Sequence, residues 1–277
     1  MQSYPLDADT RTHLMQRALL CDAPTPLSVE RQADAQVYVY TDAWNTPEIA
    51  RSYIIGAFDG MHVGHQALVH DACAYARAHD TLAVAVTFDP DPSALVGAAP
   101  QALLLTLSAR VRALAAAGVD AVVVLRFTPE LMKTSYQDFC SKVLQRFGKL
   151  ASLHVGADFA LGAQAQGTVE ALTHLGKEQG FVVMGHPLVE VTNGTVTATR
   201  IRALLQQAQL DQANELLGRC YCVHGRVEHG REQGASFGFP TANVHCDKSW
   251  CFPQQGVYAC MLHCDGHAWP AAVNVGA

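Results

Sequence analysis

The chain has 277 residues, of which 49% are hydrophobic and 16% charged, and its formal net charge is −6. A chain of this length and composition can form about two globular domains, and its negative charge gives no general attraction to nucleic acid or to an anionic membrane. We find neither an apolar run of the roughly 20 residues that a membrane span needs nor a signal peptide, and we expect a cytoplasmic protein.

Residues 1–50 form an N-terminal leader to which we assign no function. Within it, the pattern predicts a helix over residues 10–20 and a strand near residues 37–40.

Residues 51–210 alternate between apolar strands and amphipathic helices. The predicted strands cover residues 53–56, 82–88, 121–127, 150–155 and 181–189, and the predicted helices cover residues 64–79, 108–117, 135–147 and 168–179. This alternation predicts an α/β domain with a Rossmann-like parallel sheet that helices cover on both faces. Ligands of such sheets bind at the carboxyl ends of the strands.

The first of these strands runs into the sequence Gly56-Ala57-Phe58-Asp59-Gly60-Met61-His62-Val63-Gly64-His65. Glycines let the backbone approach an anion closely, and the first turn of a helix offers unpaired N–H groups and the positive end of its dipole. His62 and His65 lie three residues apart on this turn, so their side chains converge on one point. The pattern favours a phosphate site over two ordinary surface histidines. A metal pair would need a third ligand, which this stretch lacks.

This loop resembles the H-x-G-H signature of the nucleotidylyltransferase superfamily, and the F-D-G before it resembles the prokaryotic bifunctional riboflavin kinase/FAD synthetase family. Members of the superfamily attack the α-phosphate of a nucleoside triphosphate and release pyrophosphate. The resemblance implies that His62 and His65 are catalytic residues at the phosphates of ATP. It further implies an ATP-binding role for Gly56, Phe58 and Gly64 and a flavin-binding role for Asp59.

Two later loops are similar to flavin-binding loops of the same family. Asp89 follows the strand at residues 82–88 and matches the T-F-x-P-x-P loop, whereas Asp158 and Phe159 lie in a segment similar to G-x-D-F-R-F-G. In this second loop Ala160 replaces the usual arginine. The resemblance implies that Asp89, Asp158 and Phe159 contact the flavin.

The segment Thr197-Ala198-Thr199-Arg200-Ile201-Arg202 resembles the superfamily's I-S-S-T-x-I-R element, whose hydroxyls and arginine hold the β- and γ-phosphates. This implies that Thr197, Thr199 and Arg202 bind ATP and that Arg202 is catalytic together with the two histidines. A threonine at a helix start is usually only a cap, so Thr197 alone indicates little.

Residues 217–277 have the pattern of short strands joined by glycine-containing turns. Residues 238–243 match the G-F-P-T-A-N of riboflavin kinases, which implies a partial antiparallel β-barrel in which Thr241 and Asn243 hold Mg²⁺ and ATP phosphate. The catalytic glutamate of that family would fall beyond residue 277, so we expect an incomplete riboflavin-kinase-like domain without kinase activity. The cysteines and histidines of this segment do not follow zinc-knuckle spacing, and we expect buried thiols there.

Taken together, the motifs predict a FAD synthetase that transfers AMP from ATP to FMN and releases pyrophosphate. Mg²⁺ would be bound by the substrate phosphates and not by a protein-only site. The expected partners are ATP, FMN and FAD, without nucleic acid or membrane, and self-association is allowed. The alternatives are a full bifunctional riboflavin kinase/FAD synthetase, a nucleotidylyltransferase with another acceptor, and a flavin-binding protein whose chemistry has decayed.

Overall fold

The computed structural model describes residues 23–96, 101–191, 194–228, 241–264 and 267–276. The helix predicted over residues 10–20 and the first residues of the G-F-P-T-A-N segment, 238–240, lie outside the described residues. In the part of the chain that the structure describes, no helix has the length and apolar character that crossing a membrane requires.

The central element is a seven-stranded sheet with the strand order β1-β2-β5-β4-β3-β6-β9. Its strands are β1 (Ser28–Gln32), β2 (Ala35–Val39), β3 (Arg51–Ile55), β4 (Leu82–Asp89), β5 (Ala121–Arg126), β6 (Leu150–Gly156) and β9 (Val182–His186). The α-helices are α2 (Val63–Ala78), α3 (Ser93–Val96), α4 (Leu107–Ala116), α5 (Pro129–Met132), α6 (Tyr136–Asp138), α7 (Val169–Gln179), α8 (Ala198–Gln206) and α9 (Leu210–Leu217).

Short antiparallel pairs complete the described structure. They are β7 (Ala160–Leu161) with β8 (Gly167–Thr168), β10 (Glu190–Val191) with β11 (Gly194–Thr195), β12 (Arg226–Glu228) with β13 (Asn243–His245), and β14 (Gly256–Cys264) with β15 (His267–Val275).

The structure confirms the predicted α/β class, with two differences in detail. The helix predicted over residues 135–147 is α6 followed by a π-helical turn at Phe139–Val143 and a 3₁₀ turn at Leu144–Phe147. In addition, the β1–β2 hairpin adds to the sheet through antiparallel pairing of β2 with β5. Alternate residues of β2 are buried, so residues 28–39 of the leader belong to the sheet.

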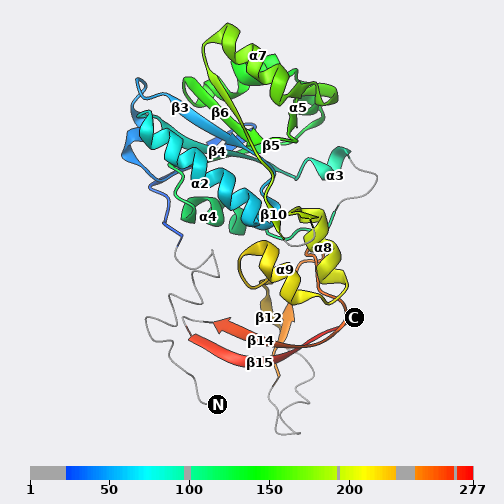
Figure 1. Cartoon of the computed structure of the whole chain (residues 1–277). Helices are drawn as coiled ribbons and strands as arrows, with labels where there is room; N and C mark the ends of the chain where they lie inside the picture. Colours follow the sequence, from blue (N-terminus) through cyan, green and yellow to red (C-terminus); the bar gives the residue numbers. More distant parts are fainter. Residues whose placement is uncertain (1–22, 97–100, 192–193, 229–240, 265–266, 277) are drawn as a thin grey trace.

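The strand order reverses between β3 and β6. The strands β3, β4 and β5 are neighbours in parallel pairing, whereas β6 and β9 continue the parallel sheet on the other side of β3. Accordingly, α2 and α4 pack on one face of the sheet, and residues 139–147 with α7 pack on the other (Figure 1). Ligands of open α/β sheets bind at such a reversal, at the carboxyl ends of the strands.

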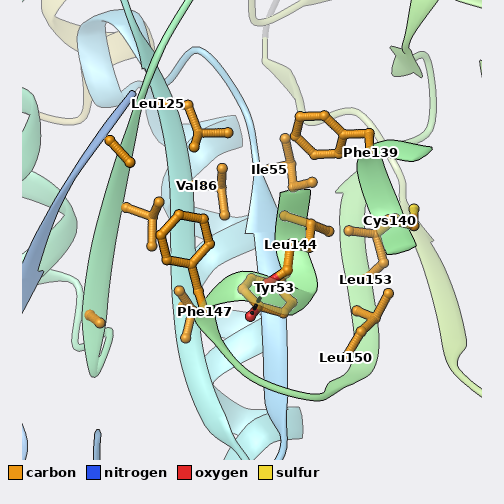
Figure 2. Close-up of a cluster of buried hydrophobic side chains, with 14 of the residues drawn as sticks. Tyr53, Ile55, Val86, Leu125, Phe139, Cys140, Leu144, Phe147, Leu150 and Leu153 are labelled. Atoms are coloured by element: carbon orange, nitrogen blue, oxygen red, sulfur yellow. Dashed lines mark hydrogen bonds between the residues drawn. The ribbon is translucent and has the colours of Figure 1, made fainter. Parts of the chain in front are cut away.

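Alternate residues of β3 enter the two cores. Tyr53 and Ile55 pack in the cluster that Figure 2 shows, where the Tyr53 hydroxyl donates to the carbonyl of Leu144 (2.9 Å). Ile54 packs on the opposite face, beneath α2 and α4. These three side chains of β3 are at most 1% exposed. Burial on both faces is typical of a central parallel strand, and it fixes the point from which the glycine loop starts.

The helices α8 and α9 lie between the sheet and the C-terminal strand pairs (Figure 1). Main-chain hydrogen bonds join the two parts, because Leu103 donates to the Ser249 carbonyl (2.6 Å) and Cys251 donates to the Leu103 carbonyl (2.8 Å). Trp250, between these partners, is 3% exposed. The short strands predicted for this segment are confirmed as antiparallel pairs.

A row of polar side chains crosses the buried face of the sheet beneath α2. The Ser152 hydroxyl donates to Ser52 Oγ (2.7 Å) and lies 3.0 Å from His154 Nε2, while His154 Nδ1 lies 3.1 Å from His186 Nε2. Burial, followed by the charges on His186 and His79, lowers the pKa of His154 to about 4. His154 is therefore neutral in the folded protein at neutral pH.

We expect the free energy of unfolding to decrease between pH 7 and pH 5. Below pH 6.5 the unfolded chain binds a proton at His154, whereas the folded protein accepts it only near pH 4. At pH 5 this residue would lower the free energy of unfolding by on the order of 2 kcal/mol. Thermal unfolding at the two pH values measures the effect, and His154→Asn should reduce it. An identical pH dependence in the variant would contradict the assignment to His154.

Candidate active site

The loop between β3 and α2 has an unusual backbone. Phe58 and Met61 have positive φ angles of 53° and 39°, and Gly60 has a φ of 79°. Such conformations cost about 1–3 kcal/mol for residues other than glycine and persist where the surroundings enforce them. The ring of Phe58 is fully buried and lies 3.0 Å from the position that a Cβ of Gly56 would occupy. Packing therefore enforces one loop shape, which sets the position of the histidines.

His62 and His65 lie together at the start of α2. His62 is the N-cap residue, and its Nδ1 accepts a hydrogen bond from the main-chain N–H of His65 (3.3 Å). The two imidazole rings stack with centroids 3.7 Å apart. Gly64 leaves room for this, because a Cβ there would lie 3.2 Å from the His62 ring. His65 Nδ1 is buried and has no hydrogen-bond partner among the described residues.

Both histidines are held in the neutral form. Burial, together with the charge of Arg219, lowers the pKa of His62 to about 4. Burial, followed by the charges on His62 and Arg110, lowers the pKa of His65 well below its usual value. At neutral pH the pair therefore offers hydrogen-bonding groups, and the positive charge near the site comes from the arginines.

Two buried arginines support the loop, and the sequence motifs indicated neither of them. Arg110 on α4 donates to the carbonyls of Ala57 (2.8 Å) and Phe88 (2.9 Å), so it joins the loop after β3 to the end of β4. Arg219 follows α9 and donates to carbonyl groups of the loop itself. Their exposed fractions are only 3% and 4%. No local signal distinguishes Arg110 from an exposed arginine of a surface helix.

Asp59 belongs to this loop, and its side chain is buried. Its carboxylate accepts hydrogen bonds from the main-chain N–H groups of Leu104 (3.0 Å) and Leu105 (2.9 Å) and from the guanidinium of Arg202 (2.6 Å). Asp59 is 3% exposed. Burial raises the pKa of this carboxyl, and the three donors oppose that shift. The carboxylate of Asp59 is thus bonded to groups of the protein itself, and the flavin contact implied by the sequence stays a prediction.

Arg202 is anchored on the same side of the loop. Besides Asp59, it donates to the Ala102 carbonyl and to the side chain of Gln101, both at 2.6 Å. Among the described residues these bonds engage three of its five N–H groups, which leaves two for a ligand. Thr197 caps α8 by accepting a hydrogen bond from the N–H of Arg200 (3.2 Å).

The remaining candidates divide between two places. Asp89 is exposed at the end of β4, and Asp158 (exposed) and Phe159 (half-buried) follow the end of β6. Because β4 and β6 are parallel to β3, all three residues lie at the carboxyl ends of the strands, where the histidine loop also begins. Thr241 and Asn243, in contrast, are exposed near the start of β13, in the C-terminal part beyond α9 (Figure 1).

Two family models match successive parts of the chain. A family model described as FAD synthetase matches residues 47–200, and one described as riboflavin kinase matches residues 217–277. The chain is 34% identical over 222 residues to the bifunctional riboflavin kinase/FMN adenylyltransferase of Pseudomonas fluorescens, which covers 80% of this chain and 71% of that protein. It is 30% identical over 245 residues to the protein of the same name from Listeria monocytogenes, and this match covers 86% of this chain and 75% of that protein.

A crystal structure of a protein described as a macrolide-efflux protein from Streptococcus pneumoniae has a similar fold. The TM-score is 0.75 at 28% sequence identity, and the match covers 82% of this chain and 74% of that chain.

The FAD synthetase match covers the parallel sheet and the loop that carries the stacked histidine pair, and it makes this protein a nucleotidylyltransferase. The relatives narrow the assignment further. The chain belongs to the bifunctional riboflavin kinase/FMN adenylyltransferase family, and it is an enzyme of the FMN adenylyltransferase type.

Proposed function

We propose that the protein makes FAD by transferring AMP from ATP to FMN. The stacked, neutral pair of His62 and His65 at the N-terminus of α2 supports this proposal most directly. An oxygen of the FMN phosphate forms a bond to the α-phosphorus of ATP, and the bond from that phosphorus to the bridging oxygen breaks. Pyrophosphate leaves with the electron pair. No general base is needed, because the FMN phosphate is already ionised.

Catalysis then consists of alignment and of stabilising the charge on the phosphates. The two histidines donate hydrogen bonds to phosphate oxygens, and main-chain N–H groups at the start of α2 add to this effect. Since Arg110 and Arg219 lie buried behind the loop, their charges act in a site of low polarity, where they are weakly screened. Gly56, Phe58 and Gly64 contribute to ATP binding by fixing the shape of the loop.

The other proposed ligand contacts involve residues near the carboxyl ends of the parallel strands. We assign Thr197, Thr199 and Arg202 to the β- and γ-phosphates of ATP, and Asp89, Asp158 and Phe159 to the flavin. Asp59 acts by holding Arg202. Thr241 and Asn243 are assigned to Mg-ATP in the kinase-like part.

We propose that Mg²⁺ enters the site bound to the phosphates of ATP. Mg²⁺ prefers oxygen ligands, and the Asp59 carboxylate in the histidine loop is already bonded to Arg202 and to main-chain N–H groups. The other side chains around the loop are imidazoles and guanidinium groups. The loop therefore suits phosphate oxygens that carry the ion. When bound, Mg²⁺ neutralises part of the phosphate charge. We place this reaction in the cytoplasm.

Incubation of the protein with FMN, ATP and Mg²⁺ tests the proposal, with FAD and pyrophosphate as the products to be measured. Pantetheine phosphate and nicotinamide mononucleotide serve as rival acceptors. Adenylylation of a rival acceptor without FAD formation would contradict the proposed substrate.

Riboflavin with ATP tests the second candidate function, which is the full bifunctional enzyme. The riboflavin kinase match over residues 217–277 favours this candidate, whereas the sequence-based expectation is that neither FMN nor FAD forms. Production of FMN from riboflavin by the purified chain would contradict that expectation and identify a working kinase.

Arg202→Lys is expected to lower kcat/KM for ATP about 10-fold or more. The guanidinium holds Asp59 and Gln101 through a planar fork and still offers N–H groups to phosphate, which a lysine cannot do. Initial rates at varied ATP, together with inhibition by pyrophosphate, measure the change. Equal values for variant and wild type would make Arg202 a purely structural residue.

A further inference from the structure

Arg219 is the third residue of the segment that matches the riboflavin kinase family, yet its side chain contacts the adenylyltransferase loop. Helix α9 ends at Leu217, and Gly218 follows with a φ of 68°. A Cβ at Gly218 would lie 2.9 Å from the side chain of Val63, the first residue of α2. The chain therefore passes directly against the start of the catalytic helix, and glycine allows this approach.

The guanidinium of Arg219 binds the backbone of the loop at Gly60 and Met61. Its Nη2 donates to the Gly60 carbonyl (2.7 Å), and its Nη1 donates to the carbonyls of Met61 (3.3 Å) and Leu217 (3.2 Å). Gly60 and Met61 both have positive φ angles. Met61 directly precedes His62, so a shift of this carbonyl would also move the imidazole.

Gln66 supports the same carbonyl groups without a charge. Its Nε2 donates to Met61 (2.7 Å) and to Leu217 (2.9 Å), from the first turns of α2. Arg219 and Gln66 thus tie the histidine loop to the end of α9 through shared acceptors. Buried carbonyl groups left without such donors would destabilise this loop shape.

Arg219 also contributes to the electrostatics of His62. It is 4% exposed, and its charge is the second cause, after burial, of the low pKa of His62. The hydrogen bonds of Arg219 among the described residues go to carbonyl oxygens, which do not neutralise its positive charge behind the loop. A buried cation acts strongly at short range because water screens it little.

We propose that Arg219 is a positioning residue for adenylyl transfer, which fixes the Gly60–Met61 backbone under His62 and adds positive charge behind the phosphate site. This inference rests on the proposed role of the histidine pair. It also implies that the first residues of the kinase-like segment belong to the adenylyltransferase, so that a cut between residues 210 and 217 would remove part of its site.

Three variants of the full chain separate the two effects. Arg219→Gln should lower kcat for FAD formation about 100-fold, as expected for misplacement of catalytic groups, and should raise the pKa of His62. Arg219→Lys keeps the positive charge but lacks the planar guanidinium that bonds to two carbonyl groups of the loop. The pKa of His62 should therefore stay low in this variant, while kcat is reduced. Gln66→Met should lower kcat and leave the pKa of His62 unchanged.

Arg226→Gln, in the exposed strand β12 of the same segment, is the matched control and should behave like the wild type. An NMR titration of His62 does not depend on turnover, so it tests Arg219 even if FMN proves not to be the acceptor. Wild-type kcat and an unchanged His62 titration in folded Arg219→Gln would overturn the proposal. If that variant does not fold, wild-type kcat in both Arg219→Lys and Gln66→Met would overturn it.

Discussion

Replacing His65 with Ala is expected to lower kcat for FAD formation by about 10²- to 10³-fold, as for the loss of one donor to transition-state charge. The buried Nδ1 of His65 has no hydrogen-bond partner among the described residues, so the protein does not use the full hydrogen-bonding capacity of this side chain. Its main-chain N–H, which bonds to His62, is unaffected by the substitution. The start of α2 should therefore remain intact in the variant.

Initial rates at saturating FMN and ATP measure this effect, and circular dichroism checks the fold. His70→Ala is the matched control, because His70 lies on the same helix and is exposed. A rate for His65→Ala within a few-fold of the His70→Ala rate would remove His65 from the catalytic machinery.

The sequence predicted the elements whose signals are local. Glycines between a β-branched strand and an amphipathic helix indicate strand, turn and helix without knowledge of the rest of the chain, and the structure has β3, the loop and α2 in these places. The spacing of His62 and His65 likewise predicted that their side chains meet. These predictions depend on residues that are close in the sequence.

Long-range contacts could not be predicted in this way. Arg219 reaches a carbonyl 159 positions earlier in the chain, and Arg110 reaches one 53 positions earlier. Nothing near either arginine in the sequence specifies such a partner. The position of the β1–β2 hairpin beside β5 is a similar case, because strand spacing does not determine the order of strands in a sheet.

Asp59 shows a different limit. The F-D-G motif implied a flavin contact for this carboxylate, which stays a prediction. In the structure the carboxylate is bonded to Arg202 and to the N–H groups near Leu104, and the preceding Phe58 has a left-handed backbone (φ 53°). A motif identifies a residue type at a position. The local dihedral angles decide whether that residue faces the ligand or the support beneath it.

Asp59→Ala is therefore expected to lower the free energy of unfolding by about 3–5 kcal/mol, as for removal of one partner from a buried ion pair. The substitution leaves the guanidinium of Arg202 without its carboxylate and leaves the N–H groups of Leu104 and Leu105 without their acceptor. Denaturant unfolding of the full chain measures the loss. Glu215→Ala is the control, because Glu215 is exposed on α9 and should change stability by less than about 0.5 kcal/mol.

A double-mutant cycle separates the ion pair from the other bonds of Asp59. If Arg202 is the main partner, Asp59→Ala combined with Arg202→Met should be no less stable than Asp59→Ala alone, because the unpaired buried charge is then absent. The N–H groups of Leu104 and Leu105 remain unpaired in both variants, so their contribution cancels. Strictly additive losses in the double variant would show that the two side chains are not coupled, which would contradict the ion pair as the main source of the loss.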